Sequence, residues 1–308
     1  MLAPSLLAAS QRPRVRRLVT TAPASRRLVD RFIAGASLDD AVDTTRLLTD
    51  AGLTVTVDRL GEDTFSLAQA DATRDAYVAL LGRLAAEGLT GRAEVSLKLS
   101  AVGQALPGPG HRIALENAHA VCEAARAAGT TVTLDMEDHT TVDSTLGILR
   151  ELRTDHPSVG AVLQSALHRT VQDCRDLAHE GSRVRLVKGA YAEPASVAHA
   201  AKAEVDRAYV RCLRILMEGA GHPMVATHDP RMIAIAQRLA EATGRSADTF
   251  EYQMLLGIRP SEQRRLRESG AQVRVYVPYG ADWYGYFMRR LAERPANVAF
   301  FVRSVFSR

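Results

Sequence analysis

The sequence is short of cysteine, of aromatic residues and of long apolar runs, and each shortage excludes a class of protein. Its 308 residues hold 3 cysteines, Cys122, Cys174 and Cys212, without the C-x-x-C spacing of a zinc ribbon. An odd number of isolated cysteines excludes a disulfide scaffold and indicates a reducing compartment, so we expect all three to pack between helices. No apolar run approaches the roughly 20 residues that a membrane-spanning helix needs.

The N-terminal stretch lacks the features of a secretory signal. Residues 1–10 are apolar, but no basic residue precedes them and arginines follow, so we predict a cytoplasmic protein. The formal net charge of +4 comes largely from arginine, which is densest in this stretch, at Arg12, Arg14, Arg16, Arg17, Arg26, Arg27 and Arg31. Phe32 is the one aromatic residue there, which argues against a nucleic-acid partner. A solvated helix face is the simpler interpretation, and peripheral contact with anionic lipid head groups is the functional alternative.

Nucleotide-binding fingerprints are also missing. Neither G-x-G-x-x-G nor G-x-x-x-x-G-K-[ST] occurs, which disfavours a doubly wound dinucleotide-binding sheet. A composition of 46% hydrophobic and 24% charged residues is typical of a folded soluble protein with a large core.

After about 50 helical, Ala/Leu/Arg-rich residues, short β-branched runs alternate with longer amphipathic stretches. Eight such units in the remaining chain predict a distorted (β/α)₈ barrel over residues 51–308, behind an N-terminal helical segment over residues 1–50. The expected strands are Thr54–Leu60, Glu94–Ser100, Thr131–Asp138, Gly160–Ala166, Arg183–Tyr191, Met224–His228, Phe250–Leu255 and Val273–Gly280. Expected helices include Ile113–Ala128, Val197–Glu218 and Arg231–Ala242, and Gly129, Gly181, Gly221, Gly244 and Gly270 are expected to end helices with a positive φ.

Alternation along the strands predicts an unusual barrel interior. On the second strand Val95 and Leu97 alternate with Ser96 and Lys98, and the third and eighth strands place Asp135, Glu137, Arg274 and Tyr276 between aliphatic residues. Because the apolar set must face the surrounding helices, the polar set must face inward. Burying Lys98 and Asp135 is costly unless they pair or meet a charged ligand. A structural ion pair between them is the plain alternative.

Two later segments carry residues suited to binding an anion. The fifth strand places Arg185 and Lys188 near its carboxyl end, where barrel active sites form, and Gly189 follows. Lys188 alone would suit a Schiff base, a phosphate ligand or a solvated surface equally well. In the last unit Tyr286, Arg289, Arg290 and Glu293 have helical spacing, so two guanidiniums adjoin and can grip a small carboxylate.

Taken together, several segments resemble one family in the right order along the chain. They are Ser96–Ser100, Leu134–Glu137, Val162–Ser165, Arg185–Tyr191, Ala226–His228, Phe250–Leu255, Tyr276–Gly280 and Tyr286–Asn297, and they look like proline dehydrogenase in its small, monofunctional bacterial form. The resemblance implies a barrel that binds FAD without a covalent bond and oxidises L-proline to Δ1-pyrroline-5-carboxylate. It further implies a quinone as electron acceptor, and it suggests coupling to a separate pyrroline-5-carboxylate dehydrogenase.

The resemblance also implies roles for individual residues. Lys98, Arg289 and Arg290 would bind the substrate carboxylate, with Asp135 and Glu293 as countercharges that hold the arginines. The walls of the substrate space would be Tyr191, Leu255, Tyr276 and Tyr286. The cofactor would contact Arg185 beside the flavin N5, Gln164 at the ring, Lys188, Gly189 and Ala190 near the phosphates, and Thr227 and His228 elsewhere.

Two positions depart from the family pattern and leave details of flavin packing open. Ala192 stands where Trp is frequent, and Leu256 where Tyr or His is frequent. Rival interpretations are an aldolase-like barrel with a Schiff base on Lys188, a metal-dependent lyase using Asp135, Glu137, Asp138 and His139, and a barrel that senses proline without turnover. The metal site is disfavoured because Asp138 has the opposite parity to Asp135 and Glu137.

Overall fold

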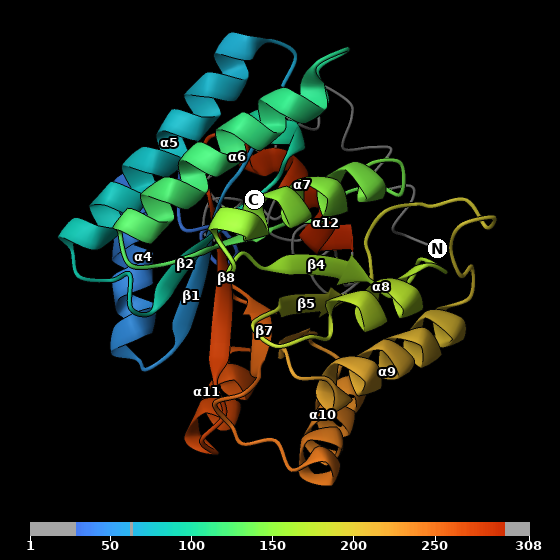
Figure 1. Cartoon of the computed structure of the whole chain (residues 1–308). Helices are drawn as coiled ribbons and strands as arrows, with labels where there is room; N and C mark the ends of the chain where they lie inside the picture. The colour runs from blue at the N-terminus through green and yellow to red at the C-terminus, as the bar shows by residue number, and fades with distance from the viewer. Residues whose placement is uncertain (1–28, 62–63, 293–308) are drawn as a thin grey trace, which may run out of the picture.

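The structure, a computed structural model, describes residues 29–61 and 64–292, and its core is a barrel of eight parallel strands (Figure 1). Neighbouring strands follow the order β3-β2-β1-β8-β7-β6-β5-β4, and a bridge between Thr133 and Gly160 joins β3 to β4 and closes the ring. This confirms the predicted (β/α)₈ barrel. The strands are β1 Thr54–Arg59, β2 Ala93–Leu97, β3 Val132–Leu134, β4 Ala161–Gln164, β5 Arg183–Val187, β6 His222–Ala226, β7 Glu251–Leu255 and β8 Val273–Tyr279.

Helices surround the barrel and bury its outward aliphatic residues. Val55, Val95, Leu186 and Val275 point outward from their strands and join one core cluster with the inner faces of the helices. The helices are α4 Leu38–Asp50, α5 Leu67–Ala86, α6 Gly110–Ala127, α7 Val142–Asp155, α8 Thr170–Leu177, α9 Lys202–Glu218, α10 Pro230–Thr243, α11 Pro260–Glu268 and α12 Trp283–Ala292, with a 3₁₀ turn, η1, at Ser100–Val102.

The first and last described helices distort the regular pattern. Helix α4 precedes β1 and packs along β1 and β8, where Ala41 and Val42 are fully buried. Its start is a capping box in which Ser37 and Asp40 satisfy each other's backbone amides. Helix α12 follows β8, and its Phe287 packs in a separate apolar cluster with Phe32 and Leu60. The described part of the N-terminal segment therefore belongs to the same packed unit as the barrel.

Of the arginines in the basic N-terminal stretch, Arg31 is the one that the structure describes. Its Nε atom donates to the carbonyl of Gly257 at 3.1 Å, and its guanidinium lies over the ring of Phe32. Phe32 itself is 1% exposed. Arg31 is exposed, as a solvated face requires, and it also fastens the chain before α4 to the loop after β7. The other six arginines lie outside the described residues.

The strands end earlier than predicted wherever polar residues follow them. Strand β2 stops at Leu97 and β3 at Leu134, so Lys98 and Asp135 lie in the loops just beyond. Helix α9 begins at Lys202 instead of Val197, because residues 194–199 pair with the loop after β4 through a bridge between Leu167 and Ala198. The late start of α9 thus arises from contact between two loops at the same end of the barrel.

Four of the five predicted helix-ending glycines have the expected positive φ, and Gly221 does not. A Cβ at Gly221 would lie 2.6 Å from the carbonyl oxygen of Ser182. The reason for glycine there is close approach of two backbones and not left-handed conformation. The three cysteines are buried in α6, α8 and α9, as predicted, and burial raises the pKa of Cys122 to about 12.

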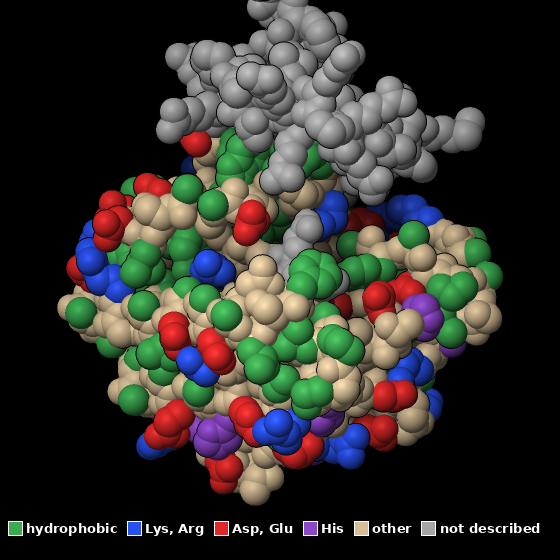
Figure 2. All heavy atoms as spheres, turned by 90° about the horizontal axis from the view of Figure 1, so that it is seen from above, with side chains coloured by type: hydrophobic (Ala, Val, Ile, Leu, Met, Phe, Trp, Pro, Cys, Tyr) green, Lys and Arg blue, Asp and Glu red, His purple; other side chains and the backbone are tan. Residues whose placement is uncertain are grey.

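Within the described part of the chain, no helix is both long and apolar enough to cross a bilayer. Seen from above in Figure 2, the described surface mixes basic and acidic side chains around scattered hydrophobic ones, and neither sign of charge forms a continuous field.

Candidate active site

A pocket of about 440 Å³ opens at the carboxyl ends of the strands, within the usual size range of ligand sites. We call it the mouth pocket. Every predicted site residue that the structure describes lines it, and Glu293 lies outside the described residues. These lining residues are Lys98, Asp135, Gln164, Arg185, Lys188, Gly189, Ala190, Tyr191, Thr227, His228, Leu255, Tyr276, Tyr286, Arg289 and Arg290.

Lys98 is held at the mouth pocket by Asp58, which follows Val57 in β1. Its Nζ lies 3.0 and 2.9 Å from the two carboxylate oxygens of Asp58, which is 1% exposed. Burial works against the charged form of Lys98, but Asp58 and Asp135 outweigh burial and raise the pKa of Lys98 above its usual value. Lys98 therefore remains a cation over the whole physiological range.

Asp135 pairs with Arg185, which corrects the predicted pairing of Asp135 with the arginines of α12. Arg185 Nη1 donates to Asp135 at 2.6 Å, and the hydroxyls of Ser96 and Tyr276 donate to the same carboxylate at 2.9 and 2.8 Å. Burial and the charge of Asp135 raise the pKa of Tyr276 well above its usual value, so its hydroxyl stays a donor. A direct Lys98–Asp135 ion pair, the plain alternative from sequence, does not form, because each group has another partner.

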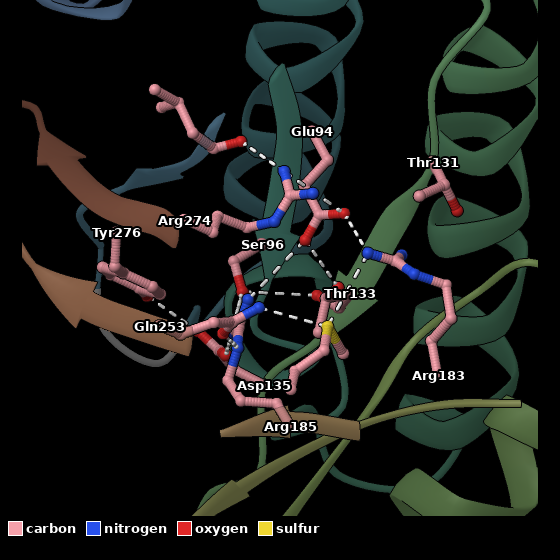
Figure 3. A network of polar contacts seen from close by, with 12 residues as sticks. Glu94, Ser96, Thr131, Thr133, Asp135, Arg183, Arg185, Gln253, Arg274 and Tyr276 are labelled. Carbon is pink, nitrogen blue, oxygen red and sulfur yellow. Dashed lines mark hydrogen bonds and ion pairs between the residues drawn. The ribbon is translucent and has the colours of Figure 1, made fainter. Parts of the chain in front are cut away.

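Below this level lies a buried layer of alternating charges (Figure 3). Glu94 Oε2 accepts from Arg183 at 2.5 Å, and Glu251 Oε1 accepts from Arg274 at 2.8 Å. Burial opposes ionisation of Glu94, yet the charges of Arg183, Arg274 and Arg185 lower the pKa of Glu94 to about 2. The interior is thus polar, as strand parity predicted, and its charges compensate one another.

Lys188 lies at the rim of the mouth pocket between two carboxylates. Its Nζ lies 2.6 Å from Asp206 in α9 and 3.1 Å from Asp229, the N-cap of α10. Burial would raise the pKa of Asp229, but hydrogen bonds from Arg231 and Lys188 hold it well below its usual value. Lys188 is therefore an ion-paired cation in this structure, and any phosphate that it meets must compete with these aspartates.

Gln164 and Gly189 shape the wall between β4 and β5. Gln164 Nε2 donates to the carbonyl of Glu137 at 2.6 Å. Gly189 has φ +105, and a Cβ there would come within 3.2 Å of Ala166 and of Gln164 Oε1. Glycine is required here by its conformation and by its own neighbours, rather than by an open space for a ligand.

The tip of β6 is held in a definite arrangement. The amide of Leu255 donates to His228 Nε2 at 2.9 Å, so this nitrogen carries a lone pair and the proton of a neutral ring lies on Nδ1. The amide of Asp229 donates to Thr227 Oγ1 at 3.1 Å. Arg259 donates to the carbonyl of His228 at 2.7 Å, which ties the loop after β7 to the tip of β6.

Helix α12 brings both of its arginines to the mouth pocket. The Arg290 guanidinium lies 5.0 Å from the ring centre of Tyr286 and is half-buried, whereas Arg289 is exposed. Tyr191, in the loop after β5, is 46% exposed at the same opening. The cations that would grip a carboxylate and the rings that would wall its carbon skeleton therefore converge on one opening.

Strand parity missed four inward residues, because β1 and β7 were not included and the alternation on β2 was followed only from Val95 onward. Asp58 on β1, Glu94 on β2, and Glu251 and Gln253 on β7 have the same alternation with aliphatic or aromatic residues as Asp135 and Tyr276. The same alternation analysis, applied to every residue of every strand, would have found them.

The rival sites gain no support from the described residues. In that part of the chain no group of three or more His, Cys, Asp or Glu side chains could hold a metal ion. His139 instead pairs with Glu193, and Glu137 accepts from the hydroxyl of Ser100 at 2.7 Å. Lys188 is already engaged in ion pairs with two carboxylates, Asp206 and Asp229.

Comparison with known proteins agrees with this geometry. A family model described as proline dehydrogenase matches residues 41–303. The proline dehydrogenase of Deinococcus radiodurans is 40% identical over 305 residues, which cover 98% of this chain and 96% of that protein. Proline dehydrogenase 1 of Bacillus subtilis strain 168 is 38% identical, with 89% of each chain covered.

A solved structure shares the fold as well. The structure of proline utilization A (PutA) from Bdellovibrio bacteriovorus, inactivated by N-propargylglycine, matches with a TM-score of 0.81 and 26% identity. The match covers 87% of this chain but 33% of that longer chain, whereas the two shorter relatives are matched over most of their length. This agrees with the expected resemblance to the small, monofunctional members. Because the family model spans most of the sequence and the likeness to the Deinococcus protein runs nearly end to end, the chain belongs to the proline dehydrogenase family.

Proposed function

We propose that this chain binds FAD and oxidises L-proline to Δ1-pyrroline-5-carboxylate, with a quinone as the final electron acceptor. The observation that carries the proposal is the convergence of Lys98, Arg289 and Arg290 with Tyr276 and Tyr286 on the mouth pocket. Three cations suit a small carboxylate, and aromatic walls suit a saturated ring. Family membership independently favours proline as the substrate.

The residues of the mouth pocket fit a flavin. Its walls combine apolar side chains, such as Met136, Val162 and Val187, with the polar groups of Gln164 and Thr227. This combination suits a flat heteroaromatic ring that needs a few fixed hydrogen-bonding partners. Lys188 at the rim would hold the cofactor phosphates, and Arg185 would lie beside N5. FAD, when bound, supplies a two-electron acceptor for the hydride that leaves Cδ of proline.

The chain's own residues contribute binding and orientation. Lys98, Arg289 and Arg290 would hold the substrate carboxylate from separate directions, which leaves the ring little freedom to turn. Tyr276 and Leu255 would limit its position from the sides. Such alignment of reacting atoms at about 3–3.5 Å accounts for a large share of the rate enhancement in reactions of this kind.

Flavin binding and reduction by proline test the proposal directly. Purified protein should be yellow or should take up added FAD, and acid precipitation should release the chromophore into the supernatant because no covalent bond holds it. L-proline under anaerobic conditions should bleach the flavin absorption. A colourless protein that neither binds FAD nor responds to proline would contradict the proposal. It would favour a barrel that senses proline without turnover.

The activity should rise with pH. Only the neutral amine of proline can release a hydride from Cδ, and we assign no protein base to its proton, so kcat/KM should rise about tenfold per pH unit below the amine pKa. The pKa of Lys98 is raised by Asp58 and Asp135 against the effect of burial, so the carboxylate anchor stays charged over this range. Steady-state kinetics from about pH 6 to about pH 9 measure the slope. A plateau beginning near neutral pH would indicate a protein base with a pKa in that range.

The acceptor should be a quinone and not NAD⁺, since the sequence has no dinucleotide fingerprint and one flavin would fill the site. We further propose that the protein works in the cytoplasm, at the inner face of the membrane. Its basic N-terminal residues would contribute about 1 kcal/mol for each one that reaches an anionic surface. A separate dehydrogenase would consume the product.

Proline-dependent reduction of a soluble ubiquinone analogue, measured beside NAD⁺, checks the acceptor. Sedimentation with anionic vesicles at low and high salt checks the surface contact. Robust NAD⁺ reduction by the protein alone would overturn the acceptor assignment.

A further inference from the structure

We propose that Gln253 and Glu251, two residues of β7 without a role so far, are positioning residues that orient Arg185. The inference rests on the proposed function, because it assigns them to the cation expected beside the flavin N5. All three side chains are buried, with exposures of 3%, 1% and 3% for Gln253, Glu251 and Arg185. Gln253 and Arg185 line the mouth pocket beside the charged layer (Figure 3), and Glu251 belongs to that layer through its ion pair with Arg274.

Arg185 is held from two sides by hydrogen bonds. Its Nη1 donates to Asp135 at 2.6 Å and to Ser96 at 2.8 Å, on the side of β2 and β3. Its Nε donates to Gln253 Oε1 at 2.5 Å, on the side of β7. A planar guanidinium that is fixed at both Nη1 and Nε can neither rotate nor tilt without losing one of these bonds. Gln253 therefore sets the plane of the guanidinium together with Asp135.

Gln253 can accept a hydrogen bond from Arg185 only in the side-chain orientation that turns its amide oxygen toward Arg185. An amide presents an acceptor oxygen on one side and a donor nitrogen on the other, and the two are similar in shape. On the far side Gln253 Nε2 meets two acceptors, Glu251 Oε1 at 2.6 Å and Met224 Sδ at 3.1 Å. A turned amide would place its oxygen against that carboxylate and its nitrogen against the Nε–H of Arg185. Glu251 thus dictates that the oxygen faces Arg185.

Glu251 is itself anchored away from the pocket. Arg274 Nε donates to Glu251 Oε1 at 2.8 Å, and Arg274 Nη1 donates to the backbone carbonyl of Val55 at 2.9 Å. Burial opposes the charge of Glu251, but Arg274 outweighs burial and lowers the pKa of Glu251. The carboxylate therefore remains an acceptor for the amide at every pH at which the protein would work. The chain of contacts runs from the backbone of β1 through Arg274, Glu251 and Gln253 to Arg185.

The test compares two variants of the FAD-loaded protein by rapid mixing with L-proline. Gln253→Met has similar volume but neither hydrogen bond, and it should slow flavin reduction at saturating proline by about 100-fold. Glu251→Gln keeps the shape but no longer dictates the amide's direction, and it should slow reduction by about tenfold. The proline concentration for half-saturation should hardly change in either variant, because Lys98, Arg289 and Arg290 are untouched.

Two further readouts separate positioning from simple loss of stability. The visible absorption band of the bound flavin should shift in both variants, while the FAD dissociation constant should stay within about threefold of the wild-type value, since other residues hold the phosphates. Tyr209→Phe is the matched control. This buried hydroxyl donates to the carbonyl of Leu186 on the outer face of the same strand as Arg185, at 3.3 Å, so its loss should lower the melting temperature without changing the reduction rate.

The outcomes test the positioning role separately from the proposed function. If Gln253→Met does not fold, Glu251→Gln carries the comparison by itself. Wild-type reduction rates and an unchanged flavin spectrum in a folded, FAD-loaded variant would overturn the positioning role and leave the proposed function intact. Failure of the wild-type protein to bind FAD or to respond to proline would instead reject the proposed function.

Discussion

Replacing Lys98 with methionine is expected to lower the free energy of unfolding by about 3–5 kcal/mol, and also to impair proline capture. The reason is that Asp58, 1% exposed, would be left buried without its bidentate partner. Urea unfolding at neutral pH measures the first effect, and kcat/KM for proline measures the second. Because the pKa of Lys98 is raised in the folded state, the pair's contribution should be complete below the unfolded pKa of lysine and should disappear as pH rises through the folded one.

A double variant and a surface variant complete this experiment. Lys98→Met combined with Asp58→Asn removes both charges, so it should recover much of the lost stability while proline capture stays impaired. Lys202→Met breaks an ion pair of a lysine side chain that is 72% exposed, and its effect should stay within about 0–1 kcal/mol. A Lys98→Met protein as stable as the wild type would mean that Asp58 does not depend on this ammonium.

Arg289→Met and Arg290→Met are expected to weaken proline capture by about 2–4 kcal/mol each, or roughly 30- to 1000-fold in kcat/KM, with little change in flavin content. The effect of Arg290→Met should lie at the upper end of this range, because Arg290 is half-buried against Tyr286. Arg289 is exposed, so its charge is more strongly screened.

The measurement is kcat/KM for proline together with the flavin-to-protein ratio of each variant. Since both arginines would bind one carboxylate, the double variant should lose less than the sum of the single effects. Arg112→Met is the matched control, because this exposed arginine pairs with Glu116 and does not line the mouth pocket. Wild-type kcat/KM in both single variants would show that α12 is a structural helix and would remove the carboxylate assignment.

The polar interior beneath the site could be predicted from residue alternation alone. On β2, β3 and β8 an aliphatic set had to face the helices, so Ser96, Asp135, Arg274 and Tyr276 had to face the interior, and the structure confirms this. Which charges pair could not be predicted, because pairing depends on how neighbouring strands are aligned. Asp58 lies opposite Ser96 in the β1–β2 register, which brings its carboxylate to Lys98 just beyond.

Contacts between loops could not be predicted from the sequence either. The late start of α9 depends on the segment before it pairing with the loop after β4. The same holds for Arg31, whose exposed side chain bonds to the carbonyl of Gly257, more than two hundred positions away. Local periodicity contains no information about such distant partners.

By itself, the sequence determined the barrel class, which follows from eight alternating strand and helix units, and the polar interior, which follows from a strand period of two and the burial of aliphatic side chains. Most of the residues at the mouth were implied by the resemblance of its motifs to a known family. Only the tertiary structure decided that Lys98 pairs with Asp58, that Asp135 and Gln253 both hold Arg185, and that Lys188 rests between two aspartates. The physical reason is that a buried charge takes the nearest countercharge in space, and in a closed barrel that partner comes from whichever strand or loop the register places beside it.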